Sequence, residues 1–126
     1  MLRIKKNQDE SVWISYSNEA EFLIRPLTAS SVEKIRKQFV KSKIGNKNGE
    51  VTIIEVVDDE KFNDALIDYI IEDWKGIGDE DGNDLDCNLE NKKLVMDISE
   101  ISEFILTAAK KLPMLSKNKI EAEIKN

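Results

Sequence analysis

Apolar and polar side chains alternate with the period of a β-strand over residues 12–25, on both sides of a Ser-Asn turn pair at 17–18. Alternating β-branched and aromatic residues around a turn pair predict a β-hairpin. Pro26 cannot donate to a strand ladder and is expected to end the hairpin. Leu2 and Ile4 could supply a short extra strand at its edge.

The spacing of apolar residues changes to the helical interval in the next segment. Residues 30–41 are expected to form a helix, in which Ser30 followed by Glu33 matches a capping box. Residues 42–50 are rich in Gly, Asn and Lys and predict a loop. The apolar run 51–57 is expected either to pair as a strand or to pack as an extended segment without a partner.

The broadest apolar stripe lies in the middle of the chain. A helix capped by Asp58 or Asp59 is expected to run to about Trp74 and to occupy a central position. Its predicted buried stripe consists of Phe62, Ala65, Leu66, Ile67, Tyr69, Ile70 and Ile71. A tight turn is expected over residues 79–83, because Asp-Gly readily supplies positive φ.

Two further helices are expected toward the end of the chain. Asn88 can cap a short helix that carries Leu89, Leu94 and Val95. Asp97 or Ser99 is expected to begin a long helix, which Pro113 stops. The predicted buried face of this helix consists of Ile98, Ile101, Ile105, Ala108, Ala109 and Leu112.

These elements predict an α+β fold, with an N-terminal antiparallel β-hairpin or small sheet packed on three to four α-helices. A mostly helical fold with only the first hairpin as sheet is the alternative. The length of 126 residues fits one domain. We place it at residues 1–112, with residues 113–126 as a C-terminal tail of low apolar density.

Composition and charge favour a protein as the binding partner. The chain is 40% hydrophobic and 35% charged, which is too apolar for wholesale disorder. Its net charge of −6 repels phosphate backbones unless basic residues gather on one face, so we expect no nucleic acid partner. The densest groups of bases are Lys34, Lys37, Lys41 and Lys43, then Lys110 and Lys111.

The chain shows no signal for export or membrane insertion. Residues 1–10 carry charges where a signal peptide needs an apolar run, and no stretch approaches the ~18 apolar residues of a membrane span. Cys87 is the only cysteine, so nothing points to an oxidising compartment. We therefore expect a cytoplasmic protein with no membrane partner.

An acidic segment resembles a calcium-binding loop. Four of its side chains fall at loop positions one, three, five and twelve: Asp79, Asp81, Asn83 and Glu90. The sixth position requires glycine for a sharp turn, and here it holds Asp84. A hairpin turn is therefore the better interpretation.

Other candidate chemistry is sparse. Ser31-x-x-Lys34 matches the Ser-x-x-Lys of serine acyl-enzymes, but neither of its companion motifs is present. The chain has no histidine, and Gly76-Ile77-Gly78 lacks the third glycine of a dinucleotide loop. We expect no enzyme and assign no catalytic, cofactor-binding or metal-binding residue.

Trp74 and Trp13 are the two tryptophans. A tryptophan at a helix end with a glycine two residues later is typical of a core anchor, so Trp74 is expected to be structural. A partner-facing hot spot is the alternative.

The middle of the chain, DALIDYIIEDWKGIGDEDGNDLDCNLENKKLVMD, resembles small phage and prophage tail assembly proteins. The segments EFLIRPLT and KIRKQF before it agree with that pattern, so the resemblance covers roughly residues 10–112. Its shared features are an apolar helix followed by Trp74-x-Gly76-Ile77, the turn Asp81-Gly82, the apolar Leu85 and the helix start Glu90-Asn91.

The resemblance implies a tail assembly chaperone of a long-tailed phage, acting in the cytoplasm of a bacterial host. Such proteins are thought to coat the helical tape measure protein and to recruit tail tube subunits to it. An apolar groove on a small acidic domain would suit that task, because exposed apolar stripes on a long helix aggregate. A structural minor tail or head–tail connection protein is the alternative, and an enzyme or metal protein is a third. Self-association stays open.

Overall fold

The structure is a computed structural model that describes the backbone of residues 10–125 and the side chains of residues 10–115. The expected strand at Leu2 and Ile4 lies outside these residues. The elements in chain order are β1 (Val12–Ser15), β2 (Glu21–Ile24), α1 (Ala29–Lys37), β3 (Val40–Lys47), β4 (Glu50–Val57), α2 (Asp59–Ile70), β5 (Ile71–Lys75), α3 (Leu89–Met96) and α4 (Ser99–Lys125).

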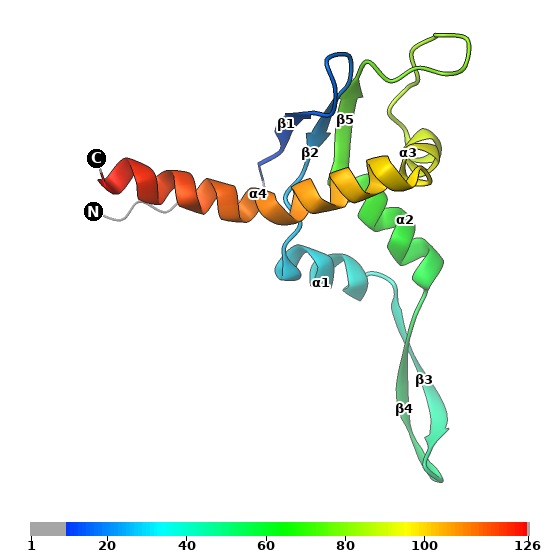
Figure 1. Cartoon of the computed structure of the whole chain (residues 1–126). Coiled ribbons are helices and arrows are strands. Elements are labelled where there is room, and N and C mark those ends of the chain that lie inside the picture. Colours follow the sequence, from blue (N-terminus) through cyan, green and yellow to red (C-terminus); the bar gives the residue numbers. More distant parts are fainter. Residues whose placement is uncertain (1–9, 126) are drawn as a thin grey trace.

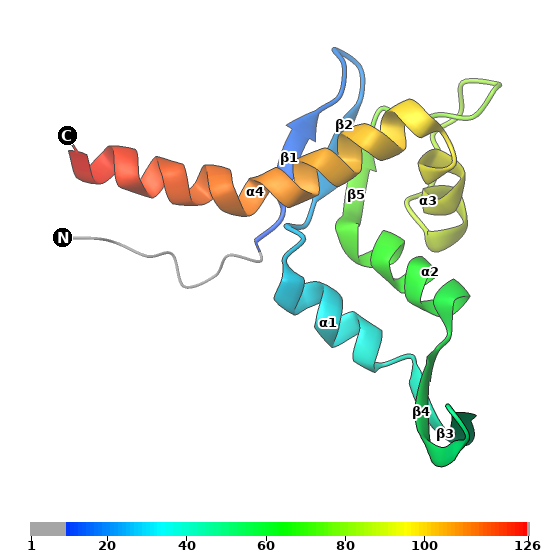
Figure 2. The same ribbon diagram turned by 60° about the horizontal axis from the view of Figure 1, so that its bottom comes forward.

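The predicted α+β fold is confirmed. Strands β1, β2 and β5 form an antiparallel three-stranded sheet in the order β1-β2-β5, and β3 pairs with β4 in a separate antiparallel ribbon. Helix α4 crosses the sheet, while the ribbon projects away from the far ends of α1 and α2 (Figures 1 and 2). None of the described helices is both long and apolar enough to span a membrane.

The core lies between one face of the sheet and α4. The predicted hairpin is confirmed, and it pairs Val12 with Ile24 and Ile14 with Phe22. Phe22 also pairs with Trp74 of β5, and their rings meet edge to face with centroids 6.3 Å apart. The buried cluster consists of Phe22, Ile24, Ile70, Ile71, Trp74, Val95, Ile105, Ala109 and Leu112.

Helix α1 begins earlier and ends earlier than the sequence predicts. Its N-cap is Thr28, whose extended backbone lets the side chain accept the Ser31 amide at 3.1 Å. The Ser31 hydroxyl accepts the Thr28 amide at 2.9 Å in return, which completes a capping box. The predicted cap at Ser30 and Glu33 is therefore wrong, and Glu33 pairs instead with Arg36 at 2.9 Å.

The predicted loop over residues 42–50 is also wrong, because most of it is strand β3 and the start of β4. Asn48 and Gly49 have φ of 55° and 85°, the left-handed conformation that a two-residue hairpin turn requires. That turn brings β3 against β4, so the apolar run at 51–57 forms a paired strand rather than an isolated extended segment.

Helix α2 carries the predicted cap at Asp58 but stops at Ile70, not at Trp74. The last carbonyls of α2 are taken by Arg25: its amide donates to Ile70 O at 2.8 Å and its guanidinium to Tyr69 O at 3.1 Å. The following residues then pair with β2 as strand β5. Pairing of β5 with β2 therefore ends the helix. The local pattern of apolar residues does not reveal this pairing.

Helices α3 and α4 follow the predicted order. Asn88 caps α3 as expected, and Asp97 is the C-cap of α3. Within the predicted face of α4, Ile105, Ala109 and Leu112 are buried, whereas Ile98 is 51% exposed.

Pro113 does not stop α4, which continues to Lys125. A proline inside a helix has no N–H for the carbonyl four residues earlier. That carbonyl belongs to Ala109, and it accepts the amide of Leu27 at 2.9 Å instead. A partner from the segment between β2 and α1 therefore satisfies the group that proline leaves free.

We predict that the Leu27 amide exchanges slowly with solvent, because its hydrogen bond to α4 breaks only when the helix leaves the sheet. Hydrogen exchange followed by NMR measures this directly. Pro113→Ala restores a helical N–H that competes for the Ala109 carbonyl, so exchange at Leu27 should accelerate. Exchange of Leu27 as fast as that of the turn at 48–49 would contradict the assignment.

Trp74 is 7% exposed and donates its indole N–H to Leu85 O at 2.8 Å. The predicted core role is thereby confirmed. Trp74→Ala is expected to lower the free energy of unfolding by about 3–5 kcal/mol, since it removes a large buried ring. Chemical denaturation measures the change.

Trp13 provides the matched control for this substitution. It is 38% exposed on the opposite face of the sheet, where Lys75 Nζ lies 4.2 Å from its ring centroid. Trp13→Ala should cost about 1 kcal/mol or less, as an exposed cation–π contact is weak. Equal losses for both variants would show that Trp74 does not anchor the core.

Candidate partner-binding groove

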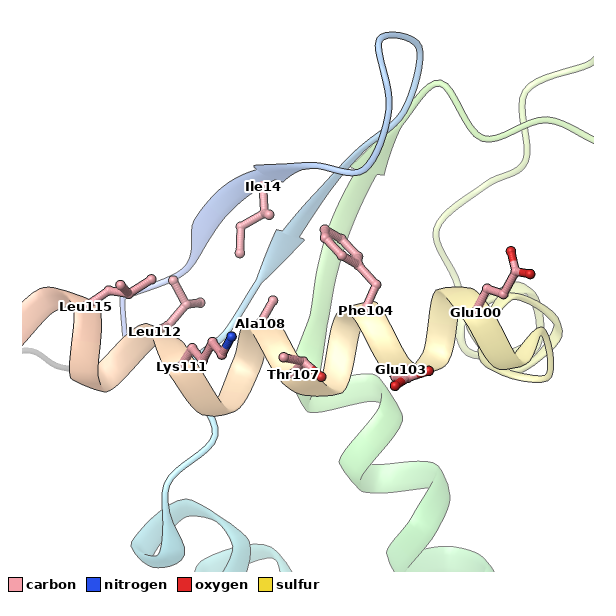
Figure 3. A pocket seen from close by; sticks show the side chains of 9 residues that line it. All are labelled: Ile14, Glu100, Glu103, Phe104, Thr107, Ala108, Lys111, Leu112 and Leu115. Atoms are coloured by element: carbon pink, nitrogen blue, oxygen red, sulfur yellow. The ribbon is translucent and has the colours of Figure 1, made fainter.

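An open groove of about 540 Å³ lies between β1 and α4 (Figure 3). One wall is Ile14 of β1, and the rest of the lining comes from α4. The lining residues are Ile14, Glu100, Glu103, Phe104, Thr107, Ala108, Lys111, Leu112 and Leu115. The groove thus exists only because α4 crosses the edge of the sheet.

The floor of the groove is an apolar stripe along α4. Phe104, Ala108, Leu112 and Leu115 recur at intervals of four, four and three residues, which places them on one helix face. Leu112 is 8% exposed and belongs to the core, whereas Leu115 is 58% exposed. The stripe therefore begins in the packed interior and continues onto open surface.

Aromatic rings close one end of this stripe. The ring of Tyr16, just after β1, lies 5.1 Å from that of Phe104 and 6.2 Å from that of Phe22, both edge to face. Ile14 points from β1 toward the same side of α4 (Figure 3). These contacts hold Phe104 against the hairpin and give the groove a firm wall.

Charged side chains lie along the rim. Glu100 and Glu103 stand toward the start of α4, and Lys111 stands about one turn before Leu115, at the end of the stripe (Figure 3). An apolar floor with acidic residues at one end and a base at the other can bind an apolar helix and select its direction, because helix ends carry opposite partial charges.

Ser31 of the Ser-x-x-Lys match is occupied by helix capping. It is 8% exposed, and its hydroxyl donates to Thr28 O at 2.9 Å while accepting the Thr28 amide at 2.9 Å. Both interactions belong to the N-terminus of α1. The structure thus gives Ser31 a structural role.

The acidic segment after β5 forms the predicted turn. Asp79 Oδ1 accepts the amides of Asp81 and Asn83, each at 2.9 Å, and Gly82 has a φ of 83°. Gly78 and Asp84 pair as an isolated antiparallel bridge below it. Among the described residues, no group of three or more Cys, Asp or Glu side chains is arranged to hold a metal ion.

Cys87 is half-buried and unpaired with another cysteine. Burial raises the pKa of its thiol above the ordinary value, and the nearby Lys92 opposes this shift. The thiol is therefore protonated at neutral pH and is a poor nucleophile.

The sequence pattern does not predict the groove. It places Ala108 and Leu112 on a buried face and predicts that the helix stops at Pro113, which would leave Leu115 in a tail. The available signal was the apolar spacing from Phe104 through Leu115 across the proline. That spacing indicates a groove only once β1 is known to lie beside α4.

We predict that the loop from Asp79 to Glu90 does not bind calcium specifically, because Asp84 stands where the sharp turn of a calcium loop requires glycine. Isothermal titration with millimolar calcium should show no saturable heat. A saturable signal that Asp79→Asn removes would prove this prediction wrong.

A known family of prophage proteins matches most of this chain. No curated protein and no solved structure matches it. The model of the YdaY prophage protein family matches residues 28–126, which include every element from α1 to α4 and leave out β1 and β2. The expected kinship with phage and prophage proteins is confirmed at this level: the chain belongs to the YdaY prophage protein family.

Proposed function

We propose that this chain is a non-enzymatic tail assembly chaperone, which binds the apolar, helical tape measure protein and assists assembly of the tail tube. The observation that carries the proposal is the groove between β1 and α4, with its apolar floor running from Phe104 to Leu115. Membership of a prophage protein family supports a role in a phage life cycle.

The dimensions of the groove suit a helix. Leu115 is eleven positions after Phe104, and at 1.5 Å per residue the stripe is roughly 16 Å long. That length faces about three turns of a partner helix. Such a helix would place residues spaced three and four apart against the stripe, as in other helix-in-groove complexes.

Charge supports the same partner. The rim acids Glu100 and Glu103 favour the N-terminal end or basic residues of a bound helix, and Lys111 favours the opposite end. The net charge of −6 keeps the bound complex dispersed once the apolar stripe of the partner is covered. Apolar contacts supply affinity, and charges set direction.

Co-expression tests the proposal. The tape measure protein expressed alone should be insoluble, and in the presence of this chain it should become soluble and co-purify with it. The complex should survive moderate salt, because salt screens interactions between exposed charges and leaves apolar contacts, which carry no charge, in place. A tape measure protein that remains insoluble would contradict the proposal.

A matched pair of variants locates the contact. Leu115 lines the groove and is 58% exposed, whereas the neighbouring Met114 is 65% exposed and lies outside it. Leu115→Asp should weaken tape measure binding about tenfold or more, since it removes one apolar anchor. Met114→Asp should bind almost as the parent does. Equal effects would place the contact elsewhere.

The protein composition of the finished phage particle distinguishes a chaperone from a structural tail protein. A chaperone leaves before the particle is complete, whereas a minor tail or head–tail connection protein stays in it. Mass spectrometry of purified virions should therefore not detect this chain. Its presence at a fixed stoichiometry would replace the chaperone function with a structural one.

A further inference from the structure

The apolar stripe of the groove changes sharply in side-chain size along α4. Phe104 and Leu112 are large, whereas Ala108, midway between them, ends at its Cβ. The helix places these residues one above another, because each is four positions from the next. Figure 3 shows the Ala108 side chain pointing toward Ile14, with the two larger side chains on either side of it. The small side chain leaves a depression between the larger ones, which we call the Ala108 socket.

The walls of the Ala108 socket are held in place by the core. Leu112 belongs to the buried cluster, and both Phe104 and Ile14 pack against that cluster. The ring of Phe104 also meets that of Tyr16 edge to face, with centroids 5.1 Å apart. These side chains would lose their packing contacts if they moved over Ala108. The socket is therefore preformed, as binding sites for apolar groups usually are.

The lining residues of α4 have the spacing that receives a second helix. Counted along α4 from Glu100 to Leu115, they are separated by intervals of three and one in turn. In packed helices, each side chain of one helix enters a hole formed by four residues of the other. One such hole in this groove consists of Phe104, Thr107, Ala108 and Lys111. The Ala108 socket is therefore built like the hole of a coiled coil, with β1 as an additional wall.

We propose that the Ala108 socket receives one large apolar side chain, of the size of leucine, methionine or phenylalanine, from a helix of the tape measure protein. This inference rests on the proposed chaperone function. Rim charges set the direction of the bound helix, and the socket sets its register along α4. A helical segment binds when a large apolar residue faces Ala108, and a segment with a charged or small residue at that place binds weakly.

Overlapping peptides that tile the tape measure protein test the socket, with fluorescence anisotropy as the measure of affinity. Ala108→Leu fills the socket and should weaken binding of the best peptide about tenfold or more, because the side chain of the partner is excluded. Ala108→Ser keeps the socket open, and Ser102→Leu adds a leucine to α4 outside the groove. Both controls should bind as the parent does, and circular dichroism should show that all three variants keep the fold.

A change on the peptide side completes the test. Replacing the large apolar residue that faces Ala108 with alanine should weaken binding to the parent. The same peptide should bind Ala108→Leu better than the unchanged peptide does, because a small residue fits a filled socket. A parent and an Ala108→Leu variant that bind the unchanged peptide equally well would overturn the socket and leave the chaperone function standing.

A small probe tests the socket without the tape measure protein. Titration of the whole chain with millimolar indole should shift the methyl NMR signals of Ile14, Ala108 and Leu112, and Ala108→Leu should abolish the shifts at the other two residues. Shifts that Ala108→Leu leaves unchanged, or that occur only at the exposed Leu94 of α3, overturn the inference. A parent that shows the expected shifts but binds no peptide would overturn the chaperone function and keep the socket.

Discussion

A hydrogen bond between the Leu27 amide and the Ala109 carbonyl joins the two halves of this chain. It exists because Pro113 leaves that carbonyl without its helical partner. Leu27 stands between β2 and α1, so the bond holds α4 across the start of α1 and the end of β2. The crossing in turn buries Ile105, Ala109 and Leu112 in the core and leaves Met114 and Leu115 at the surface.

The Trp-x-Gly motif, on which the resemblance to tail assembly proteins partly rests, is explained by packing. Trp74 fills the space beside Phe22 and bonds to Leu85 O. Gly76 has a φ of 73°, and a Cβ there would lie 1.7 Å from Glu19 O in the turn of the first hairpin. The motif is therefore explained by the close packing of the residue after β5 against that turn. It carries no direct information about a partner.

The chain presents two uncovered apolar surfaces, and they differ in shape and in charge. The groove is concave, has a rigid wall in Ile14 and bears mainly acidic residues on its rim. The ribbon of β3 and β4 exposes Ile44, Val51 and Ile53 on one face and carries Lys41, Lys43 and Lys47 on the other. The family match includes α4 and the ribbon but not β1, so one wall of the groove lies outside the matched region.

Local chemistry determined much of the fold. Period-two alternation predicted the first hairpin, and short polar side chains predicted the caps at Asp58 and Asn88, because these features act over a few residues. The α+β class followed from them. The buried role of Trp74 was predicted from a place at a helix end, and the residue is buried although it lies in strand β5. Tertiary structure alone decided where α2 gives way to β5, whether Pro113 ends α4, and that Ile14 and Leu115 share a groove. Each of these depends on hydrogen bonds or contacts between residues far apart in the chain, and such partners leave no periodic trace in a single sequence.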